Sequence, residues 1–303
     1  MEQLQFGNFD FERSSISPFL ELGAYEAIWD TTKATFKRIS EQFSTVPFSL
    51  PSDFIEEAVA QEYANRAHSM LLDSGVTEYG IRVHGAGEYP ERLRDAEYPV
   101  ELLYYQGWWD LINSPRSIAV VGTRNPSDEG KSRTRRIVRN LLNDNFTIVS
   151  GLAKGIDTVA HNTALSEGGN TIAVIGTPLT RAYPAVNSNL QNEIAKNHLI
   201  VSQVPIARYE KVKSPTHNNF FFPERNKTMS ALTDATVIIE AGETSGTLVQ
   251  ARAALRQGRK LFILENCFQN PKLTWPARFE ELGAIRVRNY EDIRSALVSQ
   301  PIH

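Results

Sequence analysis

Residues 117–127 of the chain are SIAVVGTRNPS, and the order of features in this stretch recurs along the sequence. A short apolar run leads through a turn at Gly122 to Ser127, a residue type that commonly caps a helix. Similar apolar runs, each followed by a segment suited to a helix, continue to the end of the chain. They are SIAVVG (117–122), FTIVS (146–150), TIAVIG (171–176), LIVS (199–202), ATVIIE (235–240), KLFIL (260–264) and AIRV (284–287). The alternation predicts an α/β fold built on a doubly wound parallel sheet.

The first part of the chain has a different, helical pattern. Between residues 55 and 71, apolar residues follow one another at spacings of three and four, as they do on one face of a helix. The sequence therefore predicts a small N-terminal helical domain over residues 1–80. We expect a connecting segment over 81–115 and a Rossmann-like domain over 116–303.

The composition excludes several classes of protein. Of the 303 residues, 41% are hydrophobic and 22% are charged, which is typical of a globular protein and not of a disordered chain. The single cysteine excludes a disulfide framework, and the net charge of −3 excludes a wholly basic nucleic-acid binder. No apolar run approaches the ~18 residues of a membrane span, and the start lacks a secretory signal pattern. We therefore expect a cytoplasmic protein with no membrane contact.

Three of the predicted strands are followed by loops suited to anions. In a doubly wound sheet these loops meet at the carboxyl ends of the strands, where ligands bind. Glycines let backbone amides face a ligand, a helix start favours negative charge, and Arg and Lys add positive charge. The candidate phosphate-binding residues are Gly122, Thr123, Arg124, Ser127, Ser150, Gly151, Lys154, Gly155, Ser245 and Gly246.

Two regions are basic although the chain as a whole is not. Residues 122–139 carry a net charge of +4 and residues 208–227 carry +3, which leaves −10 for the remainder. The second region contains the segment FPERNK (222–227), in which an aromatic ring, two cations and an amide lie close together. Proteins that bind single-stranded nucleic acid use rings to stack on bases and cations to follow phosphates. The candidates for such binding are Phe222, Arg225, Asn226 and Lys227.

The loops do not match common cofactor or enzyme motifs. Arg124 stands where a dinucleotide-binding fold needs a glycine close to the pyrophosphate, and the sequence contains no P-loop. A GxSxG elbow, an HExxH helix and a cluster of metal ligands are also missing from the sequence. We therefore predict no catalytic residue, no cofactor and no metal site.

Several stretches resemble the DNA-processing protein A (DprA, or Smf) family. They are YPERLRDAEYPVELLYYQG (89–107), IAVVGTRNPS (118–127), the segment from IVSGLAKGID to TRAYP (148–184), FPERNK (222–227), VIIEAGETSGTLVQARAALRQGRKLF (237–262) and ELGAIRVRNYEDI (281–293). They occur in the family's order. The resemblance implies a Rossmann-like domain that binds single-stranded DNA without sequence preference. It also implies a homodimer that helps to load the recombinase RecA during natural transformation.

Carried over by position, the resemblance implies a DNA pocket made of the strand-end loops and the segment 222–227, with Ser245 and Gly246 at its edge. The sequence departs from the family pattern where Glu265-Asn266 replaces a Pro-Gly pair. Its N-terminal helices carry no obvious family motif. The sequence stops at His303, whereas many members continue into a winged helix, so we expect a short form of the family without that C-terminal domain.

Two other functions are compatible with these motifs. Shortened relatives of this kind are antitoxins of antiphage toxin–antitoxin pairs, so a phosphoribosyltransferase toxin is an alternative partner to RecA. The superfamily also contains nucleoside-monophosphate phosphoribohydrolases, and Gln250 stands at the position of their catalytic glutamate. An amide neither stabilises a cationic sugar nor activates water as a carboxylate does, which disfavours hydrolysis. Glu240 and Asp157 are predicted instead to organise the pocket by holding arginine and backbone amides.

Overall fold

The computed structural model describes residues 16–31, 33–94, 96, 98–212 and 218–298. The predicted parallel sheet is confirmed. Its strands are β3 (Ser117–Val121), β4 (Thr147–Ser150), β5 (Thr171–Ile175), β6 (Leu199–Ser202), β7 (Ala235–Ile238), β8 (Lys260–Leu264) and β9 (Ile285–Val287). They lie in the order β6-β5-β4-β3-β7-β8-β9, and all neighbours pair in parallel. The chain builds outward from β3 to one edge and then from β7 to the other, so the switch point lies between β3 and β7.

Two further strands lie in the segment 81–115, which the sequence predicted to be a connection. β1 (Gly80–Val83) and β2 (Leu102–Gly107) pair antiparallel with each other, and β2 pairs antiparallel with β6. Leu102 and Tyr104 of β2 are fully buried, and removing these side chains from water favours the extension of the sheet. The described residues therefore form a nine-stranded mixed sheet, and this segment is part of it.

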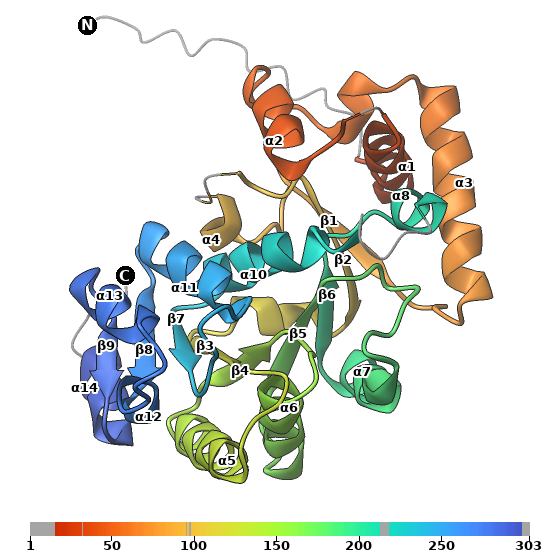
Figure 1. Cartoon of the computed structure of the whole chain (residues 1–303). Helices are drawn as coiled ribbons and strands as arrows, with labels where there is room; N and C mark the ends of the chain where they lie inside the picture. Colours follow the sequence, from red (N-terminus) through yellow and green to blue (C-terminus); the bar gives the residue numbers. More distant parts are fainter. Residues whose placement is uncertain (1–15, 32, 95, 97, 213–217, 299–303) are drawn as a thin grey trace, which may run out of the picture.

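Helices cover both faces of the sheet (Figure 1). α5, α6 and α14 pack against the face that carries Ile118 and Val120, whereas α10 and α11 pack against the face that carries Ala119 and Val121. A strand buried on both faces explains why the run 117–121 is apolar throughout. The helices of this region are α4 (Glu91–Arg94), α5 (Asp128–Asn143), α6 (Ile156–Ser166), α7 (Ser188–Asn197), α8 (Ile206–Lys211), α10 (Phe221–Ala231), α11 (Thr247–Arg256), α12 (Glu265–Phe268), α13 (Trp275–Glu281) and α14 (Tyr290–Val298).

The N-terminal region is helical, as its apolar spacing predicts. Its helices are α1 (Pro18–Trp29), α2 (Phe36–Ser44) and α3 (Glu57–Asp73), and α1 lies beside α3. Trp29 contacts Phe36 of α2 and also Phe221 of the sheet region, with ring centroids 4.7 and 5.9 Å away. The N-terminal helices therefore share one hydrophobic core with the sheet, and a domain boundary at residue 80 stays a prediction.

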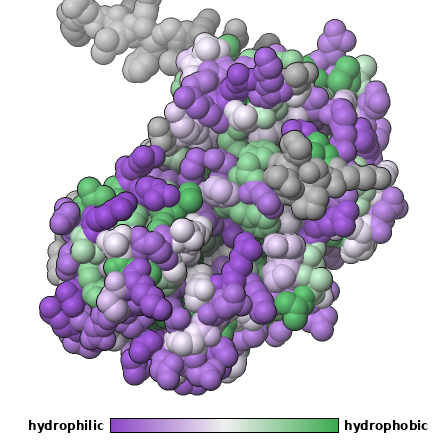
Figure 2. All heavy atoms as spheres, viewed as in Figure 1, coloured by the Kyte–Doolittle hydropathy of each residue, from purple (hydrophilic) through white to green (hydrophobic). Residues whose placement is uncertain are grey.

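The face of the molecule in Figure 2 is mostly hydrophilic, with apolar residues scattered over it. Within the described ranges, no helix combines the length and the apolar character needed to cross a membrane. The same residues contain no group of three or more His, Cys, Asp or Glu side chains arranged to hold a metal ion.

A buried carboxylate fastens α1 to the sheet region. Glu26 accepts hydrogen bonds from the Tyr104 hydroxyl (2.6 Å) and from the backbone amides of Ile206 and Ala207 (2.8 and 2.9 Å). Burial raises the pKa of Glu26, and the hydrogen bonds oppose that rise. The carboxylate thus joins three segments that are far apart in the sequence.

The substitution Glu26→Ala is expected to lower the free energy of unfolding by about 2 kcal/mol, because it leaves the buried donors at Tyr104, Ile206 and Ala207 unpaired. Urea denaturation of the full chain measures this loss. Glu62→Ala, at an exposed position on α3, is the matched control and should change stability by less than about 0.5 kcal/mol. Equal stability of the two variants would contradict the role of Glu26.

Candidate nucleic-acid interface

A pocket of about 570 Å³ opens at the carboxyl ends of β3 and β7, which is where a doubly wound sheet binds its ligands. The β3–α5 loop and the β7–α11 loop form two of its walls, and α10 forms a third. We call it the switch-point pocket. It brings together residues that are more than a hundred positions apart in the sequence, such as Arg124 and Ser245.

A cation and two aromatic rings lie along one side of this pocket. The exposed Arg124 places its guanidinium over the ring of Phe222, 5.9 Å from the ring centroid. The ring of Tyr183 lies next to that of Phe222, with centroids 5.3 Å apart, and Tyr183 is 48% exposed. A base can stack on such rings while its phosphate contacts the guanidinium.

Two glycines let the loops at the pocket pass close to one another. A Cβ at Gly122 would lie 2.7 Å from the backbone oxygen of Glu240. Gly155 has a φ of 93° and packs so tightly that a Cβ would lie 2.7 Å from the backbone oxygen of Arg124. Lys154, the residue before Gly155, is exposed and does not itself line the pocket.

Arg225 lies beneath the switch-point pocket and is only 5% exposed. Its Nη1 donates to the carbonyl oxygens of Gly151 and Val174, which lie at the ends of β4 and β5. Its Nε donates to Asn226 Oδ1 (2.9 Å), and Asn226 Nδ2 donates to the carbonyl oxygen of Gly246 (3.2 Å). The guanidinium therefore ties two strand ends to α10 and, through Asn226, to the start of α11.

A second buried charge, Asp157, lies close to Arg225. Asp157 accepts hydrogen bonds from the backbone amides of Gly151 and Ala153 (3.1 and 3.3 Å), which confirms its predicted role as an organiser of the loop. Burial raises the pKa of Asp157 to about 6, and the charge of Arg225 opposes this rise. Burial also lowers the pKa of Arg225 to about 10. Each of the two groups thus favours the charged form of the other against the effect of burial.

The start of α5 is already occupied by a carboxylate. Ser127 caps the helix by accepting a hydrogen bond from the Gly130 amide (2.9 Å). Glu240 accepts from both the amide and the hydroxyl of Ser127 (3.3 and 2.9 Å). The sequence predicted a phosphate contact at this helix start, but the negative charge of Glu240 fills it. Ser127 therefore acts as a helix cap and does not line the switch-point pocket.

A family model described as DNA recombination-mediator protein A matches residues 80–298. The chain belongs to this family. The DNA processing protein DprA of Bacillus subtilis is 32% identical over 206 residues, which are 68% of this chain and 67% of that protein. DprA of Streptococcus pneumoniae is 40% identical over 176 residues, which are 58% of this chain and 59% of that protein.

Solved structures of DprA proteins are similar over a larger part of the chain. The X-ray structure of DprA from Streptococcus pneumoniae has a TM-score of 0.72 and 28% identity, and the match covers 96% of this chain and 100% of that one. DprA from Helicobacter pylori, described for its single-stranded DNA binding mode, has a TM-score of 0.61 and 28% identity over 73% of this chain and 96% of that one. The first match also includes most of the N-terminal helices, which carry no obvious family motif.

The structure of this DprA-family chain brings most of the predicted site residues together. Those that line the switch-point pocket are Gly122, Thr123, Arg124, Phe222, Arg225, Asn226, Ser245 and Gly246. The others do not line it: Ser150 and Gly151 are buried, Lys154 and Gly155 belong to the β4–α6 loop, where Lys154 is exposed, and Lys227 is on another side of α10, paired with Glu224.

Several residues that line the pocket were not predicted from the sequence as ligand contacts, and some of them carry polar side chains that bear on a ligand. Tyr183 and Asn219 line it, and so does Gln250, whose Nε2 donates to Thr236 Oγ1 (3.2 Å). Tyr183 lies within the stretch 148–184 that resembles the family, which was the available signal. Its contact with Phe222 joins two loops that no local spacing relates.

The substitution Gly151→Ala tests whether the contacts of the buried Arg225 guanidinium stabilise the protein. A Cβ at this position would lie 2.5 Å from Arg225 Nη1, so we expect it to displace the guanidinium from its carbonyl partners. The expected loss of stability is about 1–3 kcal/mol by chemical denaturation. Gly242→Ala, in the wall of the same pocket with no atom within 4 Å of the added Cβ, should leave stability unchanged. Similar losses in both variants would count against this role of Arg225.

Proposed function

We propose that the switch-point pocket binds single-stranded DNA without sequence preference and that the protein acts in DNA processing or recombination. The observation that carries this proposal is the exposed guanidinium of Arg124 over the ring of Phe222, at the carboxyl edge of the sheet. A ring can stack on any base, and a guanidinium can contact any phosphate. Such a pair suits a nucleotide strand whose sequence is not read.

The groups around this pair fit an extended strand. Tyr183 adds a second ring that is open to solvent, and Lys154 is an exposed cation in the loop that follows β4. Asn226 and Ser245 supply polar groups between them. The Helicobacter pylori relative is described as binding single-stranded DNA, and its similarity over 73% of this chain supports the same ligand here.

Arg225 is a positioning residue in this proposal. Its Nε and Nη1 donate to Asn226 and to the carbonyl oxygens of Gly151 and Val174, and the residue is only 5% exposed. Its contribution to binding is to hold the strand ends and Asn226 in place. Phosphate contacts are assigned to Arg124 and Lys154, which are exposed.

The wider role of the protein follows from its family. A homodimer, a contact with RecA and a cytoplasmic location stay predictions, and so does the antitoxin alternative with a toxin as partner.

The proposal includes no reaction. Gln250 is buried and its amide is bonded to Thr236, so this position supplies no carboxylate for hydrolysis.

The substitution Arg124→Ala is expected to weaken binding of oligo-dT about tenfold and to reduce the slope of log affinity against log salt by about 1, because one phosphate contact is lost. Fluorescence anisotropy over a salt series measures both. Arg139→Ala is the matched control, because Arg139 is paired with Glu167 away from the pocket. If wild type shows no salt-sensitive binding to oligo-dT, the proposed function is wrong.

Phe222→Ala is expected to weaken binding by about 1–3 kcal/mol through the loss of base stacking, while the salt slope stays that of wild type. The adjacent Phe220→Ala is the control, since this ring packs on Phe221 (centroids 4.0 Å apart) and does not line the pocket. An unchanged affinity for Phe222→Ala, or an equal loss in both variants, would argue against stacking.

A further inference from the structure

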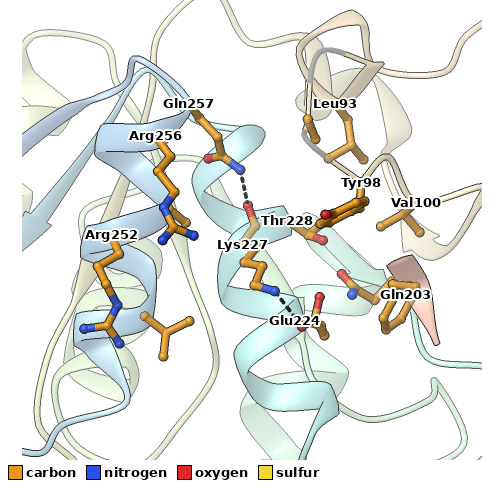
Figure 3. Close-up of a pocket in the computed structure, with 14 residues that line it drawn as sticks. Leu93, Tyr98, Val100, Gln203, Glu224, Lys227, Thr228, Arg252, Arg256 and Gln257 are labelled. Carbon is orange, nitrogen blue, oxygen red and sulfur yellow. Dashed lines mark hydrogen bonds and ion pairs between the residues drawn. The ribbon is translucent and has the colours of Figure 1, made fainter. Parts of the chain in front are cut away.

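A second pocket, of about 560 Å³, lies on another side of α10 (Figure 3). Glu224 and Lys227 of α10 line it, whereas Phe222 and Asn226 of the same helix line the switch-point pocket. α11 forms a second wall, and Leu93, Tyr98 and Val100 form a third. We call it the α10–α11 pocket. Its volume is within the range of small-molecule sites, about 300–1,000 Å³.

One wall of the α10–α11 pocket carries two uncompensated cations. Arg252 and Arg256 are exposed and lie one helical turn apart on α11, and in the described part of the chain neither has an ion pair or a hydrogen bond. Like charges four residues apart destabilise a helix. A position in the last turn favours Arg256, but Arg252 has no such compensation. Lys227 adds no net charge, because Glu224 pairs with it at 2.7 Å.

The pocket also contains buried amide oxygens without partners. Gln203 is 1% exposed and lines the pocket, and its Oε1 has no hydrogen-bond partner among the described residues. Gln257 Oε1 is likewise buried and unpaired there, although its Nε2 donates to the carbonyl oxygen of Lys227 (3.2 Å). A buried acceptor left unpaired costs about 1–3 kcal/mol. A ligand with N–H groups would remove this cost.

Between these polar groups the pocket is apolar. Phe36, Leu93 and Val100 line it and are 5%, 1% and 3% exposed. The ring of Tyr98 stands across from the two arginines of α11 (Figure 3). A flat ring with N–H groups fits the apolar side, and an anionic group fits the arginine side.

We propose that the α10–α11 pocket binds a nucleotide, with its base against Tyr98 and Gln203 and its phosphate at Arg252 and Arg256. Planar guanidinium groups contact phosphate through paired hydrogen bonds, which a lysine wall would not provide. The nucleotide is either free or part of a DNA strand that continues from the switch-point pocket. Only the second source rests on the proposed function.

Calorimetric titration of the full chain with deoxynucleoside monophosphates tests whether the pocket binds a free nucleotide. Arg252→Glu/Arg256→Glu is expected to weaken binding at least about tenfold, or 1.4 kcal/mol. Arg135→Glu/Arg136→Glu, on the exposed face of α5, makes the same change of charge outside both pockets and should leave binding unchanged. If Arg124→Ala abolishes binding and the α11 variant does not, the nucleotide lies in the switch-point pocket and the inference is overturned.

Gln203→Leu separates a ligand contact from a structural role. It removes a buried amide oxygen that has no partner among the described residues, so the midpoint of thermal unfolding should stay the same or rise while monophosphate affinity falls several-fold. A fall in the unfolding midpoint with unchanged affinity would assign Gln203 to the core and count against the proposed orientation of the base.

Oligo-dT of increasing length tests whether the bound nucleotide is part of a DNA strand. If free monophosphates do not bind, Arg252→Glu/Arg256→Glu should weaken binding of long oligonucleotides and leave short ones unaffected, because only long strands reach α11. Arg124→Ala should weaken both lengths, so failure at α11 is distinguishable from failure of the proposed function. If neither monophosphates nor long oligonucleotides respond to the α11 variant, the α10–α11 pocket is not a nucleotide site.

Discussion

The buried guanidinium of Arg225 is the interaction on which the arrangement of the switch-point pocket depends. It holds the carbonyl oxygens of Gly151, just after β4, and of Val174, near the end of β5. The residue after β4 has no side chain, which leaves room for this contact, since a Cβ at Gly151 would lie 2.5 Å from Arg225 Nη1. Asp157, in the first turn of α6, opposes the charge of Arg225, and both side chains are buried.

The contacts that these buried charges make within the chain determine which groups remain for a ligand. Asp157 holds amides of the β4–α6 loop, and Glu240 occupies the start of α5. Two of the elements that could have offered backbone dipoles to a phosphate are thus satisfied within the chain. Positive charge at the surface of the pocket comes from side chains on its rim, above all Arg124. Affinity that depends on rim side chains and stacking is sensitive to salt and indifferent to base sequence.

The sequence predicts the parallel sheet well, because strands buried on both faces are apolar throughout and cannot be mistaken for amphipathic elements. The sequence does not predict the strand over residues 102–107. This run precedes the alternation of strands and helices, and its pairing with β6 joins positions almost a hundred residues apart. At the site, residue type indicates chemistry but not burial. Arg225 and Phe222 belong to one short motif, yet Phe222 faces the pocket and Arg225 points into the protein. The contact of Glu240 with the start of α5 cannot be predicted from the sequence either, because it joins residues 113 positions apart.

The helix pair α10–α11 connects the two pockets mechanically. Asn226 Nδ2 bonds to the carbonyl oxygen of Gly246 just before α11, and Gln257 Nε2, just after α11, bonds to the carbonyl oxygen of Lys227. Two adjacent residues of α10 are therefore joined to the two ends of α11. A ligand that separates the helices at the switch-point pocket has to lengthen the first bond, and one that separates them at the α10–α11 pocket has to lengthen the second. Because residues of α10 and α11 line both cavities, a ligand that shifts one helix against the other in one pocket also changes the walls of the other.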